Sequence, residues 1–217
     1  MTQCMNFVIL GDKFQKRMKS RGCVGLIKIN NKTIIQHQYK NIKSVFPEAN
    51  IIYVYGFESK KFINFINKNP SLQTDIITIN NPNYETTNST LSLYLASQYL
   101  NDDCFITFGD NLLNSSVFHK FDQNNGSQVF INKKHKNKIG CIINNDTVEN
   151  IAYDLDNYLS EIYYLSKEDC HILQNLIDNA KYHNYFIFEI LNKLIDQNRL
   201  IKPFFINSKT STSLASY

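Results

Sequence analysis

The sequence is poor in several features whose absence narrows the classes of protein that it can encode. It has no Trp, only 4 Pro and only 7 Gly among its 217 residues. None of its apolar runs approaches the roughly 20 residues that a membrane-spanning helix requires. Its five cysteines are scattered and form no Cys-x-x-Cys pair, so neither a disulfide framework nor a zinc site is indicated. We therefore expect free thiols in a reducing compartment, the cytoplasm, and no membrane span.

The charge balance excludes little by itself. The chain carries 23 Lys and Arg against 19 Asp and Glu, a formal net charge of +4, which suits anionic small molecules as well as nucleic acid. No basic face interleaved with aromatic residues is present, so we do not expect a nucleic-acid partner. Residues Met1–Cys4 lack the charged and apolar regions of a signal peptide, so we expect none. The composition is that of a globular domain.

The first half of the chain alternates between apolar runs of strand length and segments with helical periodicity. Strands that alternate with helices form a parallel sheet with crossover helices. The predicted strands are 6–10, 26–29, 51–55, 75–79 and 105–108, and the predicted helices are 35–46, 58–67 and 90–100.

The second half is richer in strands and ends in two helices. Short polar turns join predicted strands at 129–132, 139–143, 148–153 and 159–165, and the helices begin near Ser166 and at Ile187. The last residues are rich in Ser and Thr and poor in apolar side chains. We predict an α/β domain over residues 1–202, with a mainly parallel, Rossmann-like central sheet flanked by helices and a β-rich insertion in its second half. A polar C-terminal tail is predicted over residues 203–217.

Asp110 is the residue whose setting best indicates a function. It follows the apolar run Cys104–Phe108 and Gly109, which places a carboxylate at the carboxyl end of a predicted strand. Open α/β sheets bind their ligands at that end of the strands. A carboxylate there is suited to a hard cation such as Mg²⁺. The alternative is an aspartate that only begins a turn.

Four segments resemble a known family. The most specific runs from Asn81 to Ala96 and contains Asn-Pro-x-Tyr, Thr-Asn and Ser-Leu-x-x-Ala. The others are Phe108-Gly109-Asp110, the predicted strand-turn-helix sequence of residues 26–35, and residues 161–166 with the later Phe188-Glu189 pair. With the order of elements over residues 6–198, these segments resemble the GT-A-type nucleotidyltransferases. Within that family, the sequence most resembles the small cytidylyltransferases that activate phosphocholine and related phosphate monoesters.

The resemblance implies an enzyme of Rossmann-like GT-A fold that transfers CMP from CTP to a small phosphate monoester and releases pyrophosphate. Its product would serve surface-glycan or lipid decoration. The implied cofactor is Mg²⁺, held by Asp110 and Glu189. The implied catalytic residues are Arg17, Lys28 and Asp110, and the implied nucleotide contacts are Gly11, Lys13, Arg17, Asn88 and Gly109.

The nucleotide loop departs from the family pattern. The pattern Ala-Ala-Gly-x-Gly-x-Arg corresponds to Gly11–Arg17, in which Lys13 and Gln15 replace both loop glycines. Glycine permits the close approach of backbone to phosphate that such a loop needs. The Pro-Lys pair that follows in the family is Cys23-Val24, so its phosphate-binding lysine is missing. A catalytically impaired relative that binds nucleotide or a partner protein is therefore a second hypothesis.

A GT-A glycosyltransferase is a third hypothesis. Its Asp-x-Asp hallmark is not present, because Asn111 and Leu112 follow Asp110. Three site assignments also keep structural alternatives: Arg17 as part of a solvated basic loop, Asn88 as a helix N-cap, and Glu189 as a carboxylate at a helix N-terminus. The acceptor, the base and the oligomeric state, a homodimer included, stay open at this point.

Overall fold

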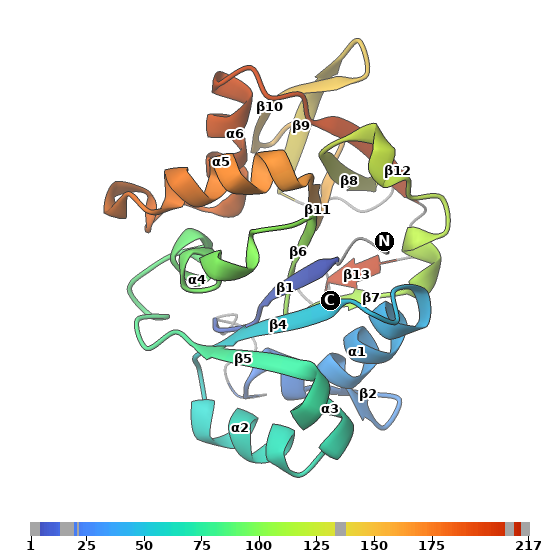
Figure 1. Ribbon diagram of the computed structural model, residues 1–217, viewed down its shortest axis with the longest axis vertical. Helices are drawn as coiled ribbons and strands as arrows, with labels where there is room; N and C mark the ends of the chain where they lie inside the picture. Colours follow the sequence, from blue (N-terminus) through green and yellow to red (C-terminus); the bar gives the residue numbers. More distant parts are fainter. Residues whose placement is uncertain (1–4, 14–19, 21, 133–137, 207–210, 214–217) are drawn as a thin grey trace.

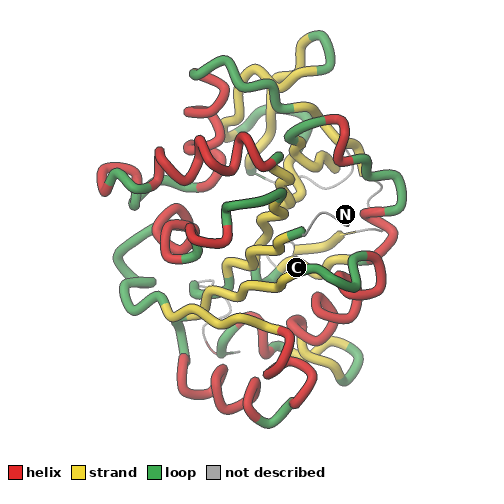
Figure 2. The backbone as a smooth tube through the Cα atoms, in the orientation of Figure 1, coloured by secondary structure: helices red, strands yellow, loops and turns green. Residues whose placement is uncertain are grey.

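The chain folds around a seven-stranded sheet with helices on both faces (Figure 1 and Figure 2). The structure is a computed structural model that describes residues 5–13, 20, 22–132, 138–206 and 211–213. The strands follow the order β12-β8-β11-β6-β1-β4-β5 across the sheet. They are β1 (Asn6–Leu10), β4 (Asn50–Tyr55), β5 (Ile76–Asn80), β6 (Cys104–Phe108), β8 (Gln128–Asn132), β11 (Leu159–Leu165) and β12 (Lys202–Ile206).

The first half of the chain builds the parallel part of the sheet. β1 pairs in parallel with β4 and β6, and β4 pairs in parallel with β5. Parallel neighbours require crossover connections, which the intervening helices provide. Because these strands share one direction, their carboxyl ends lie together at one edge of the sheet. The predicted α/β fold with a mainly parallel sheet is confirmed.

The second half adds three strands and a hairpin. β11 runs antiparallel to both of its neighbours, β6 and β8, while β12 pairs in parallel with β8. The hairpin of β9 (Ile139–Asn144) and β10 (Thr147–Tyr153) stands beside this sheet as a separate two-stranded unit. Asn192 Oδ1 on α6 (Ile187–Asp196) accepts a hydrogen bond of 2.9 Å from the Ile151 amide and so ties β10 to this helix.

Two apolar layers separate the sheet from its helices. β1 shows why: Phe7 and Ile9 belong to one buried cluster, and Val8 and Leu10 belong to the other. Both faces of a strand are apolar where both faces of the sheet are covered. The first cluster lies under α1 (Ile34–Val45), α2 (Ser59–Asn67) and α3 (Pro70–Asp75), and the second lies under α4 (Ser89–Leu95), α5 (Lys167–Ile177) and α6.

The end of the chain differs from the sequence-based assignment. Residues 203–206, which the sequence predicts to belong to a polar tail, lie in β12 at the edge of the sheet. Phe204 explains the difference, because its ring lies 4.7 Å from the ring of Phe130 on β8. Further on, β13 (Ser211–Ser213) pairs with β7 (Asn111–Leu113), directly after Asp110. The rest of the predicted tail lies outside the described residues.

Two local predictions are also corrected. The predicted strand over 26–29 is a short 3-10 helix, Val24–Leu26, followed by the hairpin of β2 (Lys28–Ile29) and β3 (Lys32–Thr33). The predicted helix over 90–100 is α4 followed by a 3-10 turn at Ser97–Tyr99. In the part of the chain that the structure describes, no helix combines the length and apolarity needed to cross a bilayer.

Candidate functional site

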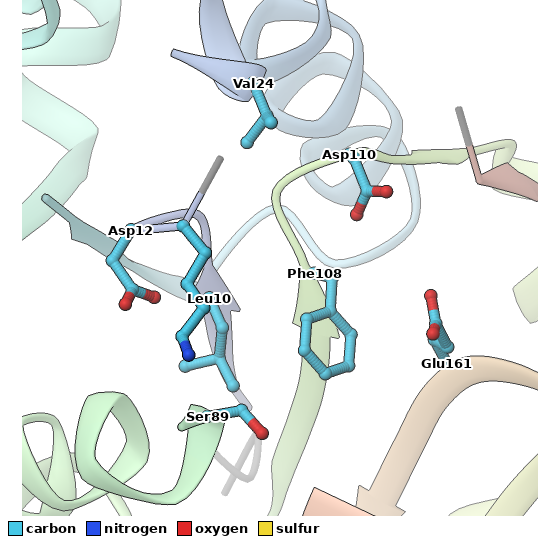
Figure 3. A pocket seen from close by; sticks show the side chains of 8 residues that line it. Leu10, Asp12, Val24, Ser89, Phe108, Asp110 and Glu161 are labelled. Carbon is cyan, nitrogen blue, oxygen red and sulfur yellow. The ribbon is translucent and has the colours of Figure 1, made fainter. Parts of the chain in front are cut away.

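A cavity of about 150 Å³ opens at the carboxyl ends of β1 and β6 (Figure 3). Ligand pockets that enclose a whole drug-sized molecule measure roughly 300–1,000 Å³. The space enclosed by the described residues is large enough for one reacting group, such as a phosphate. Its lining comes from five separate segments of the sequence: Leu10, Asp12, Lys13, Val24, Ser89, Phe108, Asp110 and Glu161.

Asp110 lies where the sequence predicted, immediately after the carboxyl end of β6. Only 7% of the residue is exposed. The preceding Gly109 donates its amide to the carbonyl of Leu10 over 2.9 Å, which joins the ends of β6 and β1. The chain can therefore present the Asp110 carboxylate to the cavity from a fixed backbone.

Glu161 supplies a second carboxylate that sequence reasoning missed. Figure 3 shows the side chains of Asp110 and Glu161 directed toward the same space. Glu161 has a φ of 59°, and the pairing register of β11 with β8 shifts between Leu159 and Tyr163. Such a bulge redirects a side chain from its regular alternation. The regular strand pattern of the sequence held no signal for it.

Asp12 and Lys13 form the other side of the lining. Asp12 is 2% exposed, and its Oδ2 accepts a hydrogen bond of 3.0 Å from Asn81 Nδ2. Burial raises the pKa of Asp12, and hydrogen bonds from Ser92 and Asn81 partly oppose that shift. Lys13 Nζ donates to Asn88 Oδ1 over 3.0 Å and to the carbonyl of Thr87. Burial lowers the pKa of Lys13, while the nearby Asp12 raises it.

Replacing Asp12 with asparagine is expected to stabilise the protein at neutral pH. The folded pKa of this carboxyl lies above its ordinary value of 3.8, so burial disfavours the charged form. The stability that the group contributes is complete below pH 3.8 and is lost as the pH rises through the folded pKa. Thermal unfolding of wild type and Asp12→Asn between pH 3 and 8 should show a gain in Tm that grows with pH. A variant that is less stable at pH 7 would contradict this account.

The structure places two other predicted site residues, Glu189 and Lys28, away from the lining of the cavity. Glu189 Oε2 accepts the amide of Phe186 over 2.7 Å and thereby caps α6. Lys28 is exposed on β2. Neither is among the residues that line the cavity, so the structure does not assemble the expected pair of Asp110 and Glu189 there. Arg17 lies outside the described residues.

The remaining predicted residues are close to the cavity. Gly11 and Gly109 each precede a lining residue, and Lys13 is itself part of the lining. Asn88 stands at the N-cap position of α4 but makes no side-chain cap hydrogen bond. Its side chain binds Lys13 and donates to the carbonyl of Asn184 over 2.6 Å. It therefore connects the loop after β1 to the segment before α6.

A divalent cation fits the chemistry of this lining. The lining offers three carboxylates and one ammonium, which is an excess of negative charge when all four ionise. Mg²⁺ is commonly bound through one or two carboxylates together with substrate phosphates. Among the described residues, no group of three or more His, Cys, Asp or Glu side chains is arranged to hold a metal alone. Asp110 and Glu161 are the carboxylates that would hold such a cation.

Comparison with solved structures identifies the fold. The CTP:phosphocholine cytidylyltransferase of Streptococcus pneumoniae matches with a TM-score of 0.79 at 18% identity, over 98% of this chain and 94% of that chain. The inositol-1-phosphate CTP transferase of T. maritima matches with a TM-score of 0.75 at 14% identity, over 99% and 90%. The chain has the nucleotidyltransferase fold. The fold class that the sequence motifs implied is thus confirmed.

The likeness extends to further members of this fold. The nucleoside-diphosphate-sugar pyrophosphorylase of Vibrio cholerae RC9 matches with a TM-score of 0.76 at 12% identity, over 96% of this chain and 95% of that chain. No protein-family model matches the sequence, and no curated protein sequence matches it. The fold is therefore shared with proteins that have little sequence identity to this chain.

Proposed function

We propose that the protein is a nucleotidyltransferase that moves CMP from CTP to a small phosphate monoester. The observation that carries the proposal is the cavity in which Asp110 and Glu161 face each other at the carboxyl ends of a nucleotidyltransferase-like sheet. Two proteins that share this fold are named for CTP as their substrate. Both of these proteins are also named for an acceptor that is a phosphate monoester, and the cavity has room for the phosphate of such an acceptor.

In the proposed reaction, an oxygen of the acceptor phosphate attacks the α-phosphorus of the nucleotide. The new P–O bond forms as the bond between the α-phosphorus and its bridging oxygen breaks, and pyrophosphate leaves with the electron pair. Such chemistry depends on positioning and on neutralising charge more than on covalent help from the protein. Mg²⁺ held by Asp110 and Glu161 would supply that neutralisation when bound.

Lys13 is proposed as the cationic contact to the phosphates. It is the sole cationic side chain that lines the cavity within the described residues. An ammonium has three N–H donors, and the bonds to Thr87 and Asn88 use two of them. The third can meet a phosphate oxygen while the other two hold the side chain in place. This role replaces the lysine that the family pattern has at Val24.

The test is a pyrophosphate-release assay. Purified protein is mixed with Mg²⁺, with each nucleoside triphosphate in turn, and with phosphocholine, inositol phosphate or a sugar phosphate. We expect pyrophosphate from CTP with at least one of these acceptors, and a signal that requires both substrates. The Lys13→Gln variant should release it more slowly. If no mixture yields pyrophosphate, the catalytic proposal is wrong for these substrates.

A second candidate function is nucleotide binding without transfer. The observation in its favour is the lining itself, where apolar Val24 stands in place of a lysine and carboxylates outnumber cationic groups. Isothermal titration calorimetry with CTP, in the presence and absence of Mg²⁺, separates the two candidates. Binding without pyrophosphate release favours this candidate, and binding with release favours the enzyme.

A further inference from the structure

The side chain of Tyr53 packs against three glycines that lie next to residues of the cavity lining. It lies in the middle of β4, is fully buried, and stacks on Phe62 of α2 with ring centroids 4.7 Å apart. Its hydroxyl reaches beyond the sheet to three glycines. A Cβ atom would lie 2.0 Å from this oxygen if built on Gly11, 2.3 Å if built on Gly25 and 2.6 Å if built on Gly109.

Each of these glycines is the neighbour of a residue that lines the cavity. Gly11 precedes Asp12, Gly25 follows Val24, and Gly109 precedes Asp110. Three segments that are far apart in the sequence therefore meet at one phenolic oxygen behind the cavity. The pKa of Tyr53 agrees with this placement: burial raises it well above 10, and Asp110 and Asp12 both contribute to the shift.

The Tyr53 hydroxyl is not held by a hydrogen bond to any described residue. A buried polar group in that condition is destabilising, and phenylalanine would keep the stacked ring without it. What the oxygen does provide is volume at the point where the three glycine backbones converge.

We propose that Tyr53 is a positioning residue of the site. Its hydroxyl acts as a spacer that sets the separation between the backbone segments that carry Asp12 and Asp110, and hence the width of the cavity. The consequence for catalysis rests on the proposed function, because only a reaction in the cavity makes its width matter. The contact between the hydroxyl and the glycines does not depend on that function.

The first test compares Tyr53→Phe with wild type. We expect the Tm to stay the same or rise, because an unpaired buried hydroxyl is removed. We expect kcat for pyrophosphate release to fall by about 10-fold with little change in KM, because misplaced catalytic groups affect the transition state most. Unchanged kcat would overturn the proposal, as would a loss of activity that follows a loss of folded protein.

A matched double variant tests whether the hydroxyl acts through its volume. The methyl group of Gly25→Ala would lie close to the space that the Tyr53 hydroxyl occupies. Gly25→Ala alone should therefore lower the Tm, whereas Tyr53→Phe/Gly25→Ala should recover both the Tm and most of the lost kcat. A double variant that is no more active than Tyr53→Phe would show that volume is not the property that matters.

Crystal structures keep this inference separate from the proposed function. If the wild-type protein releases no pyrophosphate, the proposed function fails, but the positions of the Asp12 and Asp110 backbones can still be compared. In Tyr53→Phe these segments should move toward the vacated space, and in the double variant they should return. Backbones that stay in place in Tyr53→Phe would overturn the spacer role whatever the activity of the protein.

Discussion

Replacing Asp110 with asparagine is expected to lower kcat for pyrophosphate release by at least about 100-fold, a loss typical of removing one electrostatic group from a transition state. The amide keeps the size of the side chain but not the charge that a divalent cation needs. The Tm should not fall, because the variant reduces repulsion in a lining that holds three carboxylates. Steady-state kinetics at several Mg²⁺ concentrations measures the first effect, and thermal unfolding measures the second.

Two matched variants make this result specific. Glu161→Gln removes the other carboxylate that faces Asp110, and we expect a loss of rate of the same order, with a higher Mg²⁺ requirement. Glu189→Gln is the control: the amide oxygen can still accept the Phe186 amide that Glu189 binds over 2.7 Å, so activity should be retained. Full activity in Asp110→Asn, or a large loss in Glu189→Gln, would favour a different metal centre.

The second large effect is on stability. Gly11→Ala is expected to destabilise the protein by about 3 kcal/mol, at the upper end of the cost of overpacking a core. A Cβ on Gly11 would lie 2.0 Å from Tyr53 Oη, 2.3 Å from Cζ and 2.5 Å from Cε1. The ring cannot move aside, because it is fully buried and stacked on Phe62. For a chain of this length, the Tm should fall by roughly 6–12 °C in calorimetry.

As a control, Gly11→Ala and Gly25→Ala are each made in the wild-type protein and in the Tyr53→Phe variant. Tyr53→Phe should rescue Gly25→Ala, whose Cβ has its closest contact, 2.3 Å, with the hydroxyl. It should not rescue Gly11→Ala, because the clash with ring atoms Cζ and Cε1 remains. Equal rescue of both variants would show that Gly11 is constrained by something other than the ring.

The placement of the chain's carboxylates shows where sequence reasoning succeeds. Asp110 could be located because a short apolar strand and a following Gly-Asp are local features, and the carboxyl end of a strand has a fixed place in an open α/β sheet. Glu189 could not be assigned in the same way. A glutamate in the first turn of a helix has a local use, and in this structure it caps that helix.

Asp12, Glu161 and Tyr53 show why the rest was not predictable. Asp12 reaches a buried network through Asn81, which is 69 residues away in the sequence. Glu161 faces Asp110 because of a bulge in β11, and the pattern of residue types in this strand does not predict that bulge. Tyr53 reads as an ordinary strand residue until three distant glycines are seen to surround its hydroxyl.

The sequence by itself determined the alternation of strands and helices, the parallel half of the sheet and the place of Asp110 at a strand end. These depend on periodicity and on neighbours within a few residues, which any single chain displays. Only the tertiary structure decided which carboxylates share the cavity, that β12 completes the sheet and that Tyr53 lies behind the site. Those outcomes depend on contacts between segments separated by tens of residues, and such contacts exist only once the chain has folded.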